Sequence, residues 1–198
     1  MSDVTHEPSG DICEALGVWP VRLTGAGIVG WSLWFSGDTD LVLGRHGRVP
    51  LFTSPEALAA ALAAEPDAFA PPAAARLEPV ALGQVLAAPA ADFDLDAASA
   101  WFARSDRGAD PASCEQALNA INMAADIGAT VGDARLAALF MSDALTPAHD
   151  ALTFGQTLLG DGSPLRDDPA AMAAAITPEA AGAAVRLLAL ATSHIEAA

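Results

Sequence analysis

Four polar side chains recur along one expected helix at a spacing that places them on a single face. They stand four, three and four residues apart, which is the repeat of a helical surface. Their carboxylate and amide oxygens suit a cation or a polar ligand, although the solvated side of an amphipathic helix gives the same pattern. The only two asparagines of the chain are among them, and asparagine is a poor helix former. These candidate ligand-binding residues are Glu115, Asn119, Asn122 and Asp126.

Cys114, beside this stripe, is the candidate nucleophile. It lies near the expected start of the same helix, where the helix N-terminus lowers the pKa of a thiol. Catalysis would also need a histidine folded against it, and His149 and His194 are weak candidates for that role, with His46 as a third. Cys114 equally continues a buried apolar stripe with Leu118, and a small core cysteine is the commoner outcome.

Arg45, His46 and Arg48 cluster at an expected hairpin tip in a chain with only nine basic residues. Two guanidinium groups could bind a carboxylate or phosphate through paired hydrogen bonds, so this is a weak candidate anion site. An exposed turn that simply faces solvent explains the cluster as well.

The segment Gly25–Gly30 matches G-x-G-x-x-G, the glycine pattern of dinucleotide-binding loops. Such a loop must open a helix, whereas residues 31–35 here are typical of a strand. The segment is therefore interpreted as a glycine-rich hairpin connection.

Asp92, Asp94 and Asp96 alternate as in calcium loops. The glycine and glutamate that such a loop also needs are replaced by Ala97 and Ala103. These acids are interpreted as residues that cap a helix and complement its dipole, and no metal site is expected.

A composition change near residue 53 predicts the elements that position these groups. Before it, strands are expected, and the face with Trp31, Leu33 and Phe35 should be buried against a helix at 55–64. Pro20 places the first strand towards a sheet edge. The strands are expected at 18–23, 28–35, 41–43 and 48–53, as an antiparallel meander.

After the change, alanine dominates and helix-capping residues recur. Strands followed by helices predict an α+β fold: an N-terminal antiparallel β-meander of about four strands packed against a mostly helical body. The expected organisation is 1–64 (meander plus first helix, with 1–10 disordered), 65–91 (Pro/Ala-rich connector) and 92–198 (helical body), in one domain overall. The expected helix starts are Ser54, Asp94, Asp110, Asp133, Thr146, Asp168 and Thr177.

The charge of the chain limits its partners. With 25 acidic and nine basic residues, the formal net charge is −16, which disfavours nucleic acid and anionic membranes. The N-terminus lacks a secretory signal pattern and Cys13 and Cys114 form no disulfide framework, so a cytoplasmic location is expected. Lysine-free, alanine- and arginine-biased usage points to a high-GC bacterium.

The run Cys114–Asp126 resembles a stretch in small acidic actinobacterial proteins of unknown function. In those proteins a helix containing Leu-x-x-x-Asn follows a strand–helix unit similar to Val49–Leu58. The resemblance spans about residues 40–195 and implies a neighbourhood of folds, with no activity attached.

Taken together, these observations predict a non-catalytic, cytoplasmic acidic protein that binds a partner protein. Its role would be that of an accessory or regulatory protein, or of an immunity-type inhibitor. The expected partner is a basic protein or a small polar or cationic ligand, and no cofactor is expected. The alternative is a small cofactor-independent enzyme or ligand-binding protein with its polar site on the 111–130 helix. A pocket lined by the asparagines favours the alternative, and an open acidic face favours the first; the oligomeric state is not determined.

Overall fold

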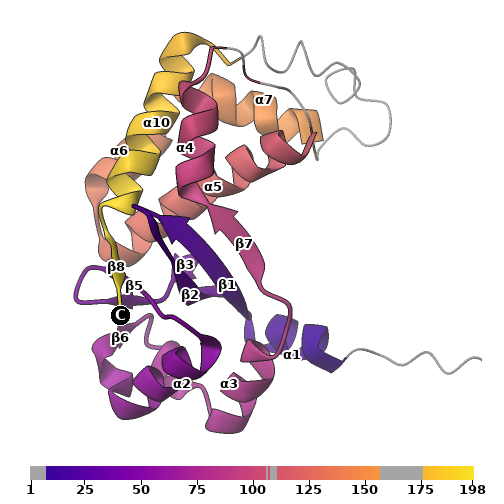
Figure 1. The fold of residues 1–198 in the computed structure, drawn as a ribbon, viewed down its shortest axis with the longest axis vertical. Helices are drawn as coiled ribbons and strands as arrows, with labels where there is room; N and C mark the ends of the chain where they lie inside the picture. The colour runs from indigo at the N-terminus through magenta and orange to yellow at the C-terminus, as the bar shows by residue number, and fades with distance from the viewer. Residues whose placement is uncertain (1–7, 106, 108–110, 157–175) are drawn as a thin grey trace, which may run out of the picture.

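The computed structural model describes residues 8–105, 107, 111–156 and 176–198, and its elements form three layers (Figure 1). A small sheet lies in the middle, and helices cover both of its faces. One helical layer consists of α1 (Pro8–Leu16), α2 (Pro55–Ala64) and α3 (Pro79–Leu86). The other consists of α4 (Leu95–Ala103), α5 (Pro111–Val131), α6 (Ala134–Phe140), α7 (Thr146–Gln156) and α10 (Pro178–Thr192). The predicted α+β class is confirmed.

The sheet is built on a long hairpin of β1 (Val18–Gly25) and β2 (Ile28–Phe35), paired from Val18↔Phe35 to Gly25↔Ile28. Its two-residue turn, Ala26 and Gly27, has φ values of 54° and 73°. This left-handed geometry matches the twist of a hairpin and is easiest for glycine. The G-x-G-x-x-G segment is thus a hairpin connection, as interpreted from the sequence.

The other two glycines of that segment allow close approach of neighbouring chain. A Cβ atom on Gly25 would lie 2.5 Å from Ile195 Cδ1, and one on Gly30 would lie 2.8 Å from Leu51 Cβ. Real Cβ atoms do not come that close to other atoms. The glycine pattern therefore reflects packing of the hairpin against the C-terminal segment and against residue 51.

The two faces of the hairpin belong to different apolar clusters. Val21 and Leu23 point towards the bundle of α4, α5 and α10. Leu33 and Phe35 point to the other side, where they pack with Leu58 of α2. Leu33 and Leu58 are fully buried, Phe35 is 5% exposed, and Trp31 is partly buried against the same cluster. The predicted burial of this face against the helix at 55–64 is confirmed.

The fourth strand of the sheet differs from the expected one. The order is β3 (Leu41–Val42), β2, β1, β7 (Ala91–Asp94), and β7 runs parallel to β1. The expected fourth strand at 48–53 is instead β5 (Val49–Leu51), which pairs in parallel with the C-terminal β8 (Ile195–Ala197). Pairings between residues so far apart in the chain leave no local pattern in the sequence.

Pro20 also lies in a different place from that predicted. β1 is an inner strand, flanked by β2 and β7. β7 pairs only with Val21–Thr24, so Pro20, which has no N–H group, is not required to donate a backbone hydrogen bond to β7. The proline is thereby tolerated within an inner strand.

Most of the expected helices begin where predicted, and four of them have an observed capping side chain. The side chains of Ser54, Asp94, Asp133 and Thr177 accept hydrogen bonds from the first turns of α2, α4, α6 and α10. The helix expected at Asp168 lies outside the described residues. α1 was not predicted: residues 8–10, expected to be disordered, are its first turn.

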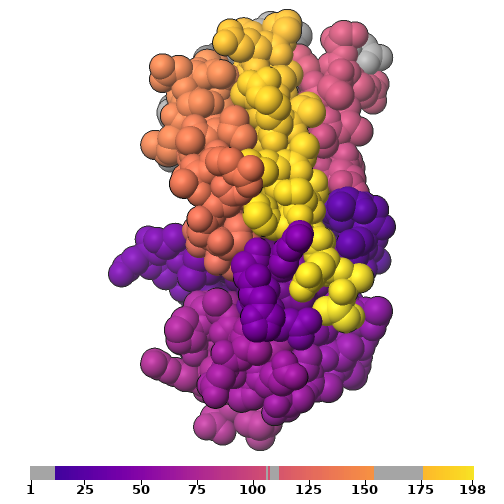
Figure 2. Space-filling view, turned by 90° about the vertical axis from the view of Figure 1, so that its left-hand side faces the viewer, coloured from indigo at the N-terminus to yellow at the C-terminus, as the bar shows by residue number. Residues whose placement is uncertain are grey.

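The segment 65–91 is folded, although its composition suggested a connector. It contains α3, two short 3₁₀ turns and β6 (Phe69–Ala70), which pairs with β4 (Gly44–Arg45). At the other end of the chain, α10 leads into β8, which lies against the lower part of the molecule (Figure 2). None of the described helices has the length and apolar character needed to cross a bilayer.

The Leu33→Ala variant should lose about 2–5 kcal/mol of unfolding free energy, because it leaves a cavity beneath the sheet. The matched control is Val29→Ala on the same strand, where Val29 is 51% exposed and the loss should stay below about 0.5 kcal/mol. Urea titration of both variants measures the difference. Equal losses in the two would show that this face of the sheet is not the core described above.

Candidate functional site

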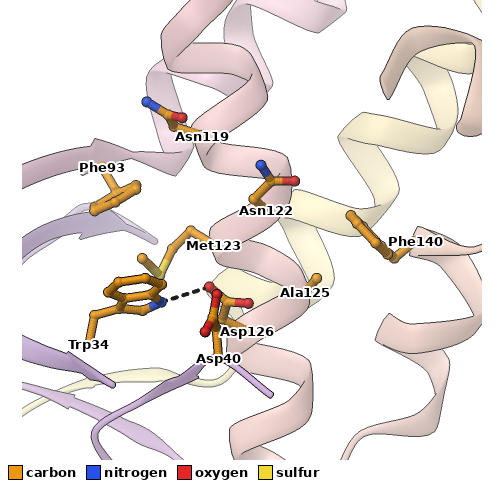
Figure 3. Close-up of a pocket in the computed structure, with 9 residues that line it drawn as sticks. All are labelled: Trp34, Asp40, Phe93, Asn119, Asn122, Met123, Ala125, Asp126 and Phe140. Carbon is orange, nitrogen blue, oxygen red and sulfur yellow. Dashed lines mark hydrogen bonds between the residues drawn. The ribbon is translucent and has the colours of Figure 1, made fainter. Parts of the chain in front are cut away.

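The polar face of α5 lines a pocket of about 430 Å³ between the sheet and the helical bundle (Figure 3). Residues from β2, β7, α6 and the loop before β3 complete its walls. The lining combines aromatic rings, carboxylates and amides, with Met123 and Ala125 at its base. The other described lining residues are the aromatic Trp34, Phe93 and Phe140, the acidic Asp40 and Asp126, and the amides Asn119 and Asn122.

Three of the four residues of the predicted polar stripe belong to this lining. Asn119 and Asp126 are half-buried, and Asn122 is exposed at the opening. Glu115 is exposed and is absent from the lining, because it lies one helical turn further towards the N-terminus of α5. The asparagines thus line a pocket and do not simply cover the solvated side of the helix.

Asp126 is the chemically unusual member of the site. Its Oδ2 atom accepts a hydrogen bond of 2.9 Å from Nε1 of Trp34, which ties α5 to the sheet. Burial raises the pKa of Asp126 to about 6, the bond from Trp34 opposes the rise, and the nearby charge of Asp40 adds to it. Figure 3 shows the two carboxylates beside the indole ring. The fold therefore keeps two acids close together in a partly desolvated place.

The aromatic rings and the carboxylates together favour a positively charged group. Trp34, Phe93 and Phe140 present rings to the pocket, and the faces of aromatic rings attract cations. The described lining contains two acids and no basic side chain. The amide oxygens of Asn119 and Asn122 add further acceptors at the opening.

His149, a predicted catalytic candidate, lies at the margin of the pocket. Its Nε2 atom is 3.0 Å from Oδ1 of Asn122, and its ring packs edge-on against Phe140. Burial lowers the pKa of His149, so the imidazole is neutral at pH 7. A neutral ring that donates to Asn122 positions this amide.

The other catalytic candidates lie elsewhere. Cys114 is 1% exposed within the core of the bundle, as its apolar spacing suggested. His194 is hydrogen bonded to Asp133, 3.0 Å away, at the start of α6. His149 and His194 are therefore engaged with Asn122 and Asp133, and a cysteine–histidine pair stays a prediction.

The basic cluster of the β4–β5 hairpin makes contacts within the chain. Arg48 Nη1 donates to the carbonyl oxygen of Ser193 at 2.6 Å, and Arg45 lies over the ring of Phe69 at 5.6 Å. His46 occupies the turn with a positive φ of 52° and is exposed. An anion site at these residues stays a prediction.

The alternating acids at 92–96 support helix α4 and the hairpin. Asp94 caps α4 by accepting from Ala97 N, and Asp96 accepts from the backbone N–H groups of Ala26 and Gly27 at 3.0 and 2.8 Å. The hairpin amides that resembled a phosphate loop are thus bound to a carboxylate of the same chain. Within the described ranges, no group of three or more His, Cys, Asp or Glu side chains could hold a metal ion.

The sequence did not indicate four residues of the pocket: Trp34, Asp40, Phe93 and Phe140. Alternation along β2 placed Trp34 on the face opposite Leu33, which was the one available signal. The others come from a loop, from β7 and from α6. Only the packing of these elements around α5 brings the four side chains together.

Comparison with known proteins identifies the family. The family model of the SatS C-terminal domain matches residues 18–176, so the chain belongs to this family. A solved structure described as "The crystal structure of SatS c-terminal domain in complex with bromine" is similar, with a TM-score of 0.57 and 19% identity over 95% of this chain and 97% of that chain. At this identity the similarity shows a shared fold alone. A search of curated proteins finds no significant match.

The Asp126→Asn variant should be more stable than the wild type at about pH 8, by about 1 kcal/mol. A carboxyl whose pKa rises on folding, here from 3.8 to about 6, penalises the folded state when ionised. The penalty is full above about pH 6 and fades as the pH falls towards the unfolded value. The stability gain should therefore shrink between about pH 8 and about pH 5 in thermal or urea unfolding.

The control for this measurement is Asp67→Asn, which removes the same charge from an exposed site in the opposite helical layer. Its effect on stability should not follow the titration of Asp126. A destabilised Asp126→Asn variant at about pH 8 would mean that the bond to Trp34 outweighs the cost of burying the charge.

Proposed function

We propose that this member of the SatS C-terminal domain family is a non-catalytic binding protein that recognises a basic partner protein. The observation that carries the proposal is the pocket at α5, in which Asp40 and Asp126 lie among aromatic rings without a basic neighbour in the described lining. Buried like charges lower stability, so an ionised pair is retained most readily where an incoming cation neutralises it.

The charge of the whole chain supports the same partner. A net charge of −16 attracts a basic protein over distances beyond direct contact and raises its association rate. The pocket then supplies specificity that net charge cannot, since its aromatic walls and amide groups have a fixed arrangement. An accessory or regulatory protein, or an inhibitor that masks a basic surface, would use both properties.

We also propose a cytoplasmic location and a bacterial, actinobacterial source. The proposal for the location rests on Cys13 and Cys114, which are both free thiols, as is usual in a reducing compartment. The proposal for the source rests on the lysine-free, alanine-rich composition. These two proposals are independent of the pocket.

The second candidate function is a small cofactor-independent enzyme or small-ligand-binding protein. Two observations favour it. The asparagines line a pocket, which is the arrangement expected for this alternative. In the row Asp126, Asn122 and His149, a carboxyl with a pKa of about 6 also lies beside an amide held by a neutral imidazole. A group that titrates near neutrality in a pocket is suited to proton transfer.

The proposal predicts which peptides the protein selects. Random peptides displayed on phage and panned against the wild-type chain should be enriched in arginine and lysine. The Asp40→Asn/Asp126→Asn double variant should lose that enrichment, and Asp67→Asn should keep it. Selection of neutral or acidic peptides, or equal selection by all three proteins, would contradict a basic partner.

The charge component has its own measurement. Association of a selected peptide in stopped flow should slow steeply between about 20 and about 150 mM salt, because exposed charges are screened over about 8–10 Å. An association rate that does not change with salt would show that the net charge has no part in binding.

The asparagines separate the two candidate functions. In a binding protein, Asn119→Ala/Asn122→Ala should retain peptide binding within about fivefold, since the carboxylates provide most of the attraction and one neutral hydrogen bond contributes about 1 kcal/mol. In the enzyme or small-ligand protein, the same variant should abolish function. Thermal melts run in parallel show whether the variant is folded.

A further inference from the structure

A second pocket adjoins the first and extends the site along α5. It also measures about 430 Å³, and it shares Asp40, Ala125, Asp126 and Phe140 with the pocket at Trp34. Its remaining wall is mostly small and apolar, because α6 passes close to α5: a Cβ atom on Gly128 would lie 2.6 Å from Leu136 Cβ. We call this second space the α5–α6 trough.

The two spaces differ in character. The pocket at Trp34 has aromatic and acidic walls, with amide groups at its opening. The trough is lined by Ala129 and Ala137 on its helices and ends at Met141, whose side chain is 76% exposed. Single exposed apolar residues are common, but one at the end of an apolar trough offers a flexible contact surface.

We infer that the pocket at Trp34 binds the arginine or lysine side chain of a partner protein, and that the α5–α6 trough binds an apolar side chain on the same face of the same partner segment. This inference rests on the proposed function and specifies what the partner presents. Because both spaces are lined by Asp40 and Asp126, the two bound side chains of the partner would lie on either side of these carboxylates.

The first half of the inference follows from charge and shape. A guanidinium group is planar, carries five donors and stacks on aromatic faces, so it matches the ring of Trp34 and the acceptor oxygens of the adjacent Asp126. Trp34 Nε1 already donates to Oδ2 of Asp126, which holds the carboxylate in place and leaves Oδ1 for a ligand. Gly37 N likewise donates to Oδ1 of Asp40 at 3.2 Å.

The second half follows from the position of the trough. The side chains that share a face with a bound arginine stand two residues away in an extended segment and three or four residues away in a helix. The trough is contiguous with the cation pocket, because both are lined by Asp40, Ala125, Asp126 and Phe140. The trough also includes Asp133, but its carboxylate is already bonded to Arg135 and His194. The remaining walls of glycine, alanine and methionine favour a leucine-like side chain.

The test uses the indole N–H signal of Trp34 in the ¹H–¹⁵N spectrum of the full chain, assigned by its loss in Trp34→Phe. Acetyl-arginine amide should shift this signal, and acetyl-citrulline amide, a neutral isostere, should bind at least about fivefold more weakly, the equivalent of losing one contact of about 1 kcal/mol. A short peptide with leucine two positions after arginine should bind more tightly than the same peptide with serine in place of leucine.

Variants locate the binding. Asp126→Asn and Asp40→Asn should each weaken arginine binding by about fivefold or more, and Asp67→Asn should not. Ala137→Gln on the exposed side of α6 should remove the advantage of leucine over serine, because it places a neutral polar side chain in the trough and adds no charge beside the cation pocket. Melting curves of each variant show that it is folded, and Asp126→Asn is expected to gain stability at about pH 8.

The outcomes separate this inference from the proposed function. Arginine and citrulline amides that shift the Trp34 signal equally, or an arginine amide that leaves it unmoved, would overturn the cation pocket even if basic peptides are still selected by panning. Binding of arginine amide without any preference for leucine would overturn the trough. Binding of arginine amide by a protein that selects no basic peptides would instead overturn the protein partner and leave a small-cation site.

Discussion

The β1–β2 hairpin is apolar on both faces, and the rest of the structure depends on covering each of them. Val21 and Leu23 need one apolar layer, and Leu33 and Phe35 need another. A hairpin alone is marginally stable, so this one depends on its burial between two helical layers. The same arrangement brings α5 across the sheet, and the candidate site lies where that helix meets β2 and β7.

The Asp126 carboxylate, which contacts Trp34, is a choice that does not favour the stability of the core. An apolar residue in place of Asp126 would pack between the layers without a buried charge. Burial instead raises the pKa of the Asp126 carboxyl, and the nearby charge of Asp40 adds to the rise. Local choices that lower stability are most often found where a protein binds or reacts. The acidity of the chain is thus not spread evenly over solvated surface: part of it lies inside a pocket with aromatic walls.

The glycine segment at 25–30 illustrates how one chemical arrangement can serve structure or ligand binding. Exposed backbone N–H groups in a tight turn attract an anion, which is the basis of phosphate-binding loops. Here the anion is Asp96 of α4, which bonds to Ala26 and Gly27. The contact joins the hairpin to the start of the helical bundle and fills the place that a phosphate would take. A sequence pattern alone does not distinguish these outcomes, because the carboxylate comes from about seventy residues further along the chain.

The sequence by itself determined the elements whose signals are local. Alternation along β2 defined its two faces, and the capping residues at Ser54, Asp94, Asp133 and Thr177 located four helix starts, because each acts within one turn of its own helix. The spacing of Asn119, Asn122 and Asp126 likewise placed them on one face of α5. Only the tertiary structure decided that β7 and β8 pair where they do, and that Trp34, Asp40, Phe93 and Phe140 surround the polar face. Those contacts join segments distant in sequence, and their free energy comes from burying surfaces that no local pattern pairs with each other.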